Sequence, residues 1–116
     1  MKQPSVIYQK EVGKIVSQIV SGYKPEKVIL FGSLASGKIN LNSDIDLLII
    51  KETRDSYFDR VKKIASIIDT SFPTDIFVLT PQEFNKAVRD NRFFIVNEVL
   101  PKGRVVYEQA KIRRRH

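Results

Sequence analysis

The hydrophobic positions follow two different repeats along the chain, and their alternation predicts helices separated by short strands. Apolar residues that recur every three to four positions indicate amphipathic helices over residues 5–21, 54–70 and 93–100. Short apolar runs that are rich in β-branched residues indicate strands over residues 27–31, 44–50 and 75–79, with a last short strand at 105–107. A chain in which strands alternate with helices is typical of an α/β layered fold.

Start and stop signals sharpen several of these boundaries. Gly22 and Pro25 are expected to end the first helix, and Pro101 and Gly103 are expected to stop the helix that begins at residue 93. Thr80, Pro81 and Glu83 form a helix start, because threonine caps the backbone, proline suits the first turn and glutamate reaches back to complete a capping box. We also expect a tight turn and one helical turn over residues 32–37, and a polar loop over 38–43.

The chain has 116 residues, which predicts one domain rather than a catalytic domain with a separate substrate-binding domain. We expect that domain to span residues 1–110 as a small mixed sheet with helices packed on it, an α/β (α+β) fold. Residues 111–116 form a basic tail that carries part of the net charge of +7. A basic balance suits nucleotide phosphates, nucleic acid or an acidic partner, although a basic tail is also a common solvated terminus.

Composition excludes several kinds of chemistry. The chain has no cysteine, which rules out disulfides, zinc–thiolate sites and thiol nucleophiles, and its one histidine is the terminal His116. Any metal site must therefore use carboxylates, which favour hard cations such as magnesium. No apolar run is long enough to cross a bilayer and the first residues lack the core of a signal peptide, so a cytoplasmic location is expected.

The predicted strand 44–50 begins with two carboxylates, Asp44 and Asp46, next to an apolar run. Alternate residues of a strand share a face, so these side chains would lie side by side, roughly 7 Å apart. Two like charges against an apolar wall are unfavourable, and a divalent cation relieves both the repulsion and the desolvation. The alternative is that Asp44 belongs to the preceding turn and Asp46 lies on the solvent face of an edge strand.

A third carboxylate, Asp75, begins the predicted strand 75–79. If the two strands are neighbours, Asp75 would stand beside the pair, and three carboxylates at one end of a sheet can bind one or two magnesium ions. The alternative for Asp75 alone is a polar strand start after Pro73 and Thr74, which leaves the other two carboxylates unexplained.

The strand 27–31 runs directly into a glycine-containing turn. Gly32 allows backbone N–H groups to approach an anion closely, and Ser33 adds a hydroxyl donor, although a plain strand-to-helix turn uses the same residues. Residues 32–38 also fit the G-x-x-x-x-G-K body of a Walker A loop. Because Ile39 stands where that loop needs serine or threonine, and no helix is predicted after Lys38, we reject the Walker reading.

The segment FGSLASGKINLNSDIDLLII resembles the signature of DNA polymerase beta-like nucleotidyltransferases, and in particular of the minimal nucleotidyltransferases. The matching positions are Gly32, Ser33, Gly37, Ser43, Asp44, Asp46 and Leu47. The resemblance implies that Gly32 and Ser33 hold the phosphates of ATP and that Asp44 and Asp46 ligate two Mg²⁺ ions. It further implies that Asp75 ligates one of these ions and helps to activate an acceptor hydroxyl. Leu34 departs from the arginine that many members carry after Gly-Ser; Lys38 is a candidate substitute, although a solvated lysine in a loop is the simpler interpretation.

Minimal nucleotidyltransferases of this kind are often paired with a HEPN-domain protein as antitoxin and toxin. The resemblance therefore implies that this chain is the antitoxin and transfers AMP to a tyrosine of a HEPN toxin (AMPylation). The alternative is a non-catalytic module that binds a nucleotide or the HEPN protein and neutralises it by complex formation. Because the sequence predicts one small catalytic domain, we expect the acceptor to come from a partner chain or to lie across a homo-oligomer interface. Nucleic acid is not expected as a direct substrate, because basic and aromatic residues are not interleaved.

Overall fold

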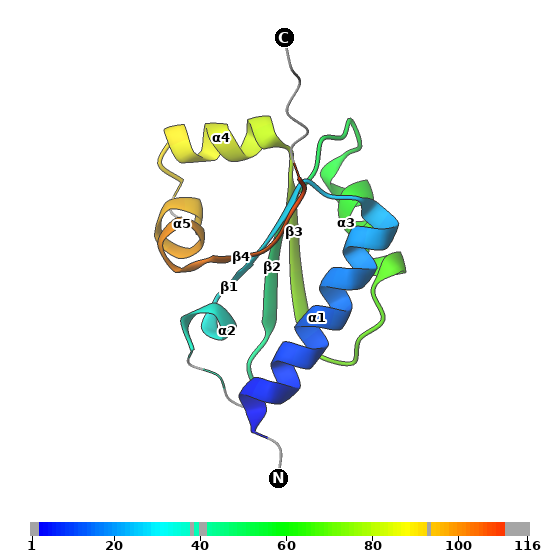
Figure 1. Cartoon of the computed structure of the whole chain (residues 1–116). Coiled ribbons are helices and arrows are strands. Elements are labelled where there is room, and N and C mark those ends of the chain that lie inside the picture. Colours follow the sequence, from blue (N-terminus) through cyan, green and yellow to red (C-terminus); the bar gives the residue numbers. More distant parts are fainter. Residues whose placement is uncertain (1–2, 38, 40–41, 93, 111–116) are drawn as a thin grey trace.

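The computed structural model describes residues 3–37, 39, 42–92 and 94–110 (Figure 1). The helical elements are α1 (Pro4–Tyr23), α2 (Ser33–Ser36), α3 (Tyr57–Ile67), α4 (Pro81–Arg89), the π-helical segment η1 (Phe94–Val99) and α5 (Leu100–Lys102). The strands are β1 (Lys27–Phe31), β2 (Ile45–Ile50), β3 (Thr74–Leu79) and β4 (Arg104–Glu108). The loop that was predicted over 38–43 lies partly outside the described residues, and the basic tail 111–116 lies wholly outside them.

The four strands form one mixed sheet in the order β3-β2-β1-β4. β1 pairs antiparallel with β2 on one side and with β4 on the other, whereas β2 and β3 are parallel. The connection between the parallel strands passes through α3, as a parallel crossover requires. The α/β prediction is confirmed, and the two carboxylate-bearing strands are neighbours, which is the condition under which Asp75 was expected to stand beside the other carboxylates.

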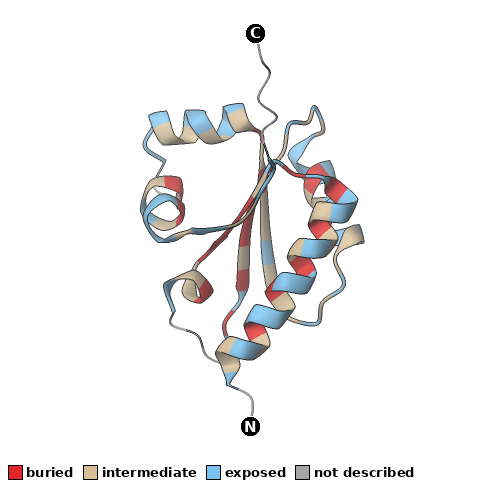
Figure 2. Cartoon of the chain, viewed as in Figure 1, coloured by how far each residue is buried: buried red, intermediate tan, exposed pale blue. Residues whose placement is uncertain are grey.

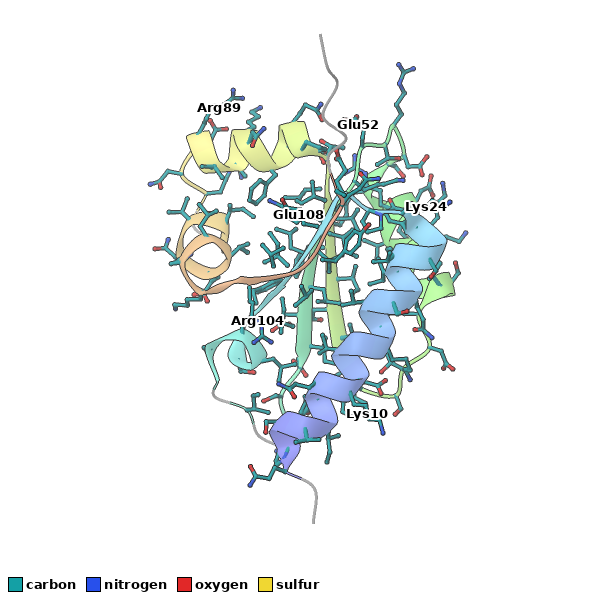
Figure 3. All side chains as sticks on the ribbon, viewed as in Figure 1. Lys10, Lys24, Glu52, Arg89, Arg104 and Glu108 are labelled. Atoms are coloured by element: carbon teal, nitrogen blue, oxygen red, sulfur yellow. The ribbon has the colours of Figure 1, made fainter. Side chains whose placement is uncertain are left out.

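Helices cover both faces of the sheet (Figure 1). On one face α1 and α3 pack against the strands, with a core that includes Ile15, Ile19, Leu47 and Ile64. On the other face η1 and α4 cover a second cluster of buried side chains: Ile29, Phe31, Leu48, Ile50, Ile95 and Val99. Figure 2 shows the buried residues following the inner sides of α1 and of the strands. Charged side chains such as Lys10, Lys24 and Arg89 project away from the sheet (Figure 3).

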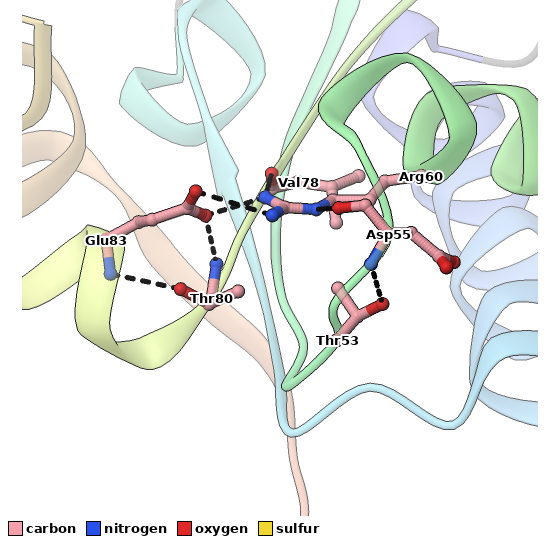
Figure 4. A network of polar contacts seen from close by, with 6 residues as sticks. All are labelled: Thr53, Asp55, Arg60, Val78, Thr80 and Glu83. Atoms are coloured by element: carbon pink, nitrogen blue, oxygen red, sulfur yellow. Dashed lines mark hydrogen bonds and ion pairs between the residues drawn. The ribbon is translucent and has the colours of Figure 1, made fainter.

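The helix α4 begins with the predicted capping box. The Thr80 hydroxyl accepts the Glu83 N–H at 3.1 Å, and a Glu83 carboxylate oxygen accepts the Thr80 N–H at 2.8 Å. The buried Arg60 of α3 then ties this helix start to the sheet, because its guanidinium donates to Glu83 at 2.6 Å and to the Val78 carbonyl at 3.2 Å (Figure 4). This network fixes the position of α4 relative to β3.

Several predicted boundaries differ from the structure. The first helix continues past Gly22 and ends at Lys24, whose left-handed φ of 53° closes it. The second predicted helix is shorter than 54–70, since Ser56 caps its start and Ile68 is already extended. The last helical stretch continues through Pro101 and ends at Lys102, directly before Gly103, the second of the two residues predicted to stop it.

The strand predicted at 44–50 begins one residue later, so Asp44 precedes β2 instead of opening it. The strand predicted at 75–79 begins one residue earlier, at Thr74. Among the described residues, none of the helices is both long and apolar enough to cross a membrane.

Candidate active site

Two of the predicted carboxylates are register partners in the parallel pair of strands. Asp46 of β2 lies opposite Asp75 of β3, so their side chains leave the same face of the sheet on strands roughly 4.8 Å apart. Asp46 is half-buried, whereas Asp75 is exposed. Burial raises the pKa of Asp46 to about 6, aided by a hydrogen bond with Asp75 and by the negative charges of Asp75 and Asp44. The fold therefore concentrates negative charge at this point.

The third carboxylate, Asp44, is exposed and lies in the segment that leads into β2. The preceding residue, Ser43, is buried, and its carbonyl accepts a hydrogen bond of 2.7 Å from the Tyr8 hydroxyl of α1. The next residue, Ile45, donates its N–H to the Pro73 carbonyl at 2.9 Å. Asp44 is thus held from both sides, although it belongs to a turn and not to the strand. Asp46, by contrast, lies on an interior strand of the sheet, so the edge-strand alternative does not hold.

Gly32 lies directly against Asp46. It follows β1, whose last residue, Phe31, is the register partner of Asp46 across the antiparallel pair. Its backbone has a φ of 76° and a ψ of −155°, a conformation that is essentially restricted to glycine. A Cβ atom at this position would also collide with the Asp46 carboxylate. The turn can therefore approach the Asp46 carboxylate this closely only because residue 32 has no side chain.

Ser33 begins α2 immediately beyond Gly32, as the predicted turn and single helical turn require. The Ser36 N–H donates to the Gly32 carbonyl at 3.2 Å, and Gly37 ends the turn with a left-handed φ of 84°. The predicted phosphate-binding pair Gly32–Ser33 thus stands at the same end of the sheet as the three carboxylates. The Leu34 side chain is buried in the core beneath α1, and Lys38 lies outside the described residues.

The donor set fits a hard divalent cation, since it consists of carboxylate oxygens. The raised pKa of Asp46 and its hydrogen bond with Asp75 show that the fold holds these two carboxyl groups close together, as two ligands of one cation must be. As the described side chains stand, no three acidic, histidine or cysteine residues are grouped closely enough to hold a metal ion. The residues that fit a divalent cation are therefore Asp46 and Asp75. Asp44 lies near enough for its negative charge to raise the pKa of Asp46.

A larger hollow of about 680 Å³ lies on the opposite face of the sheet, between α1, α2 and β4. Leu30, Leu34 and Val12 contribute to its lining, and the same side belongs to the core beneath α1. Asp46 instead shares its face with Leu48 and Ile50, which pack under η1. This hollow is therefore separated from the carboxylates by the sheet itself.

Two residues that support the site, Tyr8 and Arg60, could not be identified from the sequence. Tyr8 reads as one more residue of an amphipathic helix, and nothing in the chain signals that its hydroxyl meets the backbone at residue 43. Arg60 reads as a solvated charge on α3, yet its side chain is 8% exposed and bonded to Glu83. Ile95 and Val99 are buried, whereas Phe93 lies outside the described residues.

Three comparisons with known proteins bear on this site. The model of a family described as polymerase beta, nucleotidyltransferase matches residues 14–112. A protein of Methanocaldococcus jannaschii that is provisionally named a protein adenylyltransferase is 35% identical over 103 residues, which cover 85% of this chain and 97% of that protein. A crystal structure from Sulfolobus solfataricus, provisionally named a nucleotidyltransferase, superposes with a TM-score of 0.65 at 22% identity and covers 94% of this chain and 91% of its own.

A further crystal structure, of a toxin–antitoxin with AMP-PNP, superposes with a TM-score of 0.51 at 23% identity. It covers 84% of this chain and 73% of the matched chain. At 22% and 23% identity, the similarity to these two structures shows only that the fold is shared.

Proposed function

The chain belongs to the polymerase beta nucleotidyltransferase family, and from that premise we propose that it transfers AMP from ATP to a hydroxyl group of a partner protein. The observation that carries the proposal is the contact of three elements at one end of the sheet. Asp46 lies beside Asp75, Gly32 lies against Asp46, and Ser33 follows at once. This is where a triphosphate and a divalent cation could be held together, and no structural role explains why the fold places these carboxylates side by side.

In the proposed reaction the chain positions the reactants and manages charge. Gly32 and Ser33 hold the β- and γ-phosphates through backbone N–H groups and a hydroxyl. Asp44, Asp46 and Asp75 would hold the divalent metal, for which the resemblance implies two Mg²⁺ ions. When bound, the metal would neutralise negative charge on the phosphates.

Asp75 accepts the proton of the acceptor hydroxyl. The acceptor oxygen then forms a bond to the α-phosphorus, and the bond from that phosphorus to the oxygen bridging to the β-phosphate breaks. Pyrophosphate leaves on the side of Gly32. Because Asp75 is exposed, it can meet a hydroxyl that is presented by a second molecule.

The proposed acceptor is a HEPN-domain toxin, with this chain as its antitoxin. Support comes from the relative that is provisionally named a protein adenylyltransferase and from the structural similarity to a toxin–antitoxin with AMP-PNP. The net charge of +7 is compatible with an acidic partner surface as well as with ATP. A homo-oligomer in which a second copy completes the acceptor side remains part of the same proposal.

The direct test is transfer from α-labelled ATP in the presence of Mg²⁺, with and without a HEPN protein encoded in the same genome. Label on the HEPN protein that disappears with the Asp44→Ala/Asp46→Ala variant would support the proposal. Metal-dependent ATP binding without transfer to any acceptor would overturn the enzymatic proposal and favour the module that neutralises its partner by binding. Mass spectrometry of the labelled product would identify the modified residue.

A further inference from the structure

The strand β3 forms one edge of the sheet, and half of its backbone groups face away from β2. N–H groups at the beginning of β2 and directly after it donate to the carbonyls of Pro73 and Leu79, each at 2.9 Å. The odd-numbered residues of β3 therefore turn their backbone groups toward β2 in this parallel ladder. The N–H and C=O groups of Thr74, Ile76 and Val78 then point to the outer edge of the sheet.

Side chains close the outer edge at the carboxyl end of β3. The Val78 carbonyl accepts a hydrogen bond of 3.2 Å from the Arg60 guanidinium (Figure 4). The next outward-facing residue, Thr80, donates its N–H to the Glu83 carboxylate at 2.8 Å. Arg60 and Glu83 are themselves joined by an ion pair of 2.6 Å. From the Val78 carbonyl onward, these polar side chains take the place that a further strand would occupy.

The amino half of the same edge has no such cover. Among the residues that the structure describes, the outward N–H and C=O groups of Ile76 have no hydrogen-bond partner. Thr74 and Ile76 are partly exposed, and Asp75 between them is exposed. Unpaired groups on a sheet edge are a template for pairing with another chain, and natural proteins usually block them. Here the block ends before the stretch of β3 that carries Asp75.

A strand added antiparallel on this edge would face Asp75 closely. The backbone of Asp75 is turned toward β2, so Thr74 and Ile76 would exchange the hydrogen bonds with the added strand. Asp75 and the residue opposite it would form the non-hydrogen-bonded pair between them, in which Cα atoms lie about 4.5 Å apart. Residues in such a pair project from the same face of the sheet, so a hydroxyl on the opposite residue would lie beside the Asp75 carboxylate.

The outer edge of β3 is also the side from which an acceptor approaches in the proposed reaction. Groups that attack and leave a phosphorus atom lie roughly in line, on opposite sides of it. Pyrophosphate leaves toward Gly32, which follows β1, and the strand order β3-β2-β1 puts the open edge of β3 on the other side of Asp46. An added strand would therefore bring its hydroxyl from the attacking side.

We propose that the acceptor protein binds through an extended segment that adds to the sheet as an antiparallel strand on Thr74–Ile76, with its hydroxyl-bearing residue opposite Asp75. This inference rests on the proposed function and adds to it the way in which the acceptor is held. Backbone hydrogen bonds give such a complex its affinity, and the position of the hydroxyl along the segment decides which residue is modified. Ile76 is a positioning residue, because its backbone aligns the acceptor without contact to the reacting atoms.

The variant that tests the proposal is Ile76→Pro, which removes the outward N–H but no hydrogen bond to β2, since a proline is tolerated where the N–H of an edge strand faces solvent. Ile76→Ala is its matched control, because it loses the side chain and keeps the N–H. Transfer from α-labelled ATP onto the HEPN protein encoded in the same genome is measured, with circular dichroism as the check on folding. We expect kcat/KM for the HEPN protein to be about tenfold or more lower in Ile76→Pro than in Ile76→Ala, while the KM for ATP of the two variants agrees within about twofold.

Backbone hydrogen exchange of the wild-type chain makes the test independent of turnover. The isotope-labelled chain is followed by NMR with and without the unlabelled HEPN protein. In the free chain the Ile76 amide should exchange faster than that of Phe77, whose N–H faces β2. Addition of the HEPN protein should slow exchange at Ile76 about tenfold or more. If Ile76→Pro does not fold, or if its KM for ATP changes, this measurement decides the proposal alone.

The outcomes separate the added strand from the chemistry. Protection of the Ile76 amide without any transfer would support the added strand and overturn the proposed function. Transfer with unchanged exchange at Ile76, or equal kcat/KM in the proline and alanine variants, would overturn the added strand and leave the function standing. An Ile76 amide that already exchanges as slowly as Phe77 in the free chain would also overturn the inference, because the edge would then be covered. A HEPN protein that neither binds nor accepts label would overturn both proposals.

Discussion

The Tyr8 hydroxyl donates a hydrogen bond of 2.7 Å to the Ser43 carbonyl, 35 residues further along the chain. The ring of the same tyrosine meets Phe72 edge-on, with centroids 5.2 Å apart. Ser43 leads into Asp44 and β2, and Phe72 leads into β3, which carries Asp75. One side chain of α1 therefore contacts both segments that deliver carboxylates to the site.

We predict that Tyr8→Phe separates these two contacts, because it keeps the ring against Phe72 and removes the hydrogen bond to Ser43. The free energy of unfolding should fall by about 1 kcal/mol, the usual worth of a buried hydrogen bond, and the buried Ser43 carbonyl would lose a partner. The rate of nucleotidyl transfer should fall further than stability alone explains. Urea denaturation and transfer assays check this, with the exposed Tyr57→Phe as control. A Tyr8→Phe chain with wild-type turnover would contradict the positioning role.

Gly32→Ala is predicted to abolish transfer and to destabilise the chain, because the added Cβ meets the Asp46 carboxylate in a backbone conformation that alanine disfavours. Backbone strain of this kind costs about 1–3 kcal/mol before the collision is counted. Gly37→Ala is the matched control, since its φ of 84° is also positive but a Cβ there would meet nothing within 4 Å. Thermal melting should therefore rank the two variants, with Gly32→Ala the lower. Equal melting temperatures would show that contact with Asp46 is unimportant.

Asp46→Asn should stabilise the chain in the absence of metal. The pKa of Asp46 is raised to about 6, chiefly by burial, so the folded chain binds this proton more tightly than the unfolded chain. The free energy of unfolding then falls as the pH rises from about 4 to about 6, and an uncharged asparagine escapes that loss. After screening by solvent the gain at pH 8 should be about 1 kcal/mol, and it should vanish near pH 3.

The same pair of proteins tests the metal. Mg²⁺ should raise the melting temperature of the wild type and leave that of Asp46→Asn nearly unchanged, because a ligand that binds only the folded state stabilises it. Differential scanning fluorimetry with and without EDTA makes the comparison. An equal response of both proteins to Mg²⁺ would place the ion elsewhere.

Glu83→Gln should lower the free energy of unfolding by about 1 kcal/mol at pH 7, since it weakens the bond to Arg60 and the cap of α4. Arg60 holds the pKa of Glu83 below its usual value. The advantage of glutamate is therefore fully present above about pH 4.5 and is lost as the pH falls through the lower pKa of the folded state. Glu98→Gln, which removes only an exposed pair with Lys102, should change stability by less than about 0.5 kcal/mol. Urea denaturation at pH 7 and at pH 3 would measure both, and a loss that persists at pH 3 would contradict the ionic explanation.

The strands could be predicted well because their cores are short apolar runs rich in β-branched residues, and glycine or proline lies close to the ends of β1, β3 and β4. β1 matches its predicted range of 27–31, and the capping box of α4 is confirmed at Thr80 and Glu83. The predicted length of α3 was wrong, because the ends of this helix depend on the Ser56 cap and on a hydrogen bond from the Asp69 N–H to Gln18 of α1. That last contact joins residues 51 apart, and no local pattern carries it.

The candidate site was predictable as a set of residues but not as a geometry. The spacing of Asp44 and Asp46 and the apolar run after Asp75 marked the carboxylates, and the structure brings Asp46 and Asp75 together as register partners. Their roles as metal ligands stay a prediction. The hydroxyl of Tyr8 and the guanidinium of Arg60 could not be found in advance, because their partners lie in segments that only tertiary packing brings close.

The order of strands in the sheet has a consequence for synthesis on the ribosome. β1 and β2 can pair as soon as both have emerged, since they are antiparallel and near in sequence, but β4, the other neighbour of β1, is the last strand made. Until Arg104–Glu108 arrives, the apolar strand Lys27–Phe31 presents an open backbone edge. Unpaired edges of apolar strands recruit other chains. Nascent molecules that stall before residue 104 should therefore be the ones that aggregate or require a chaperone.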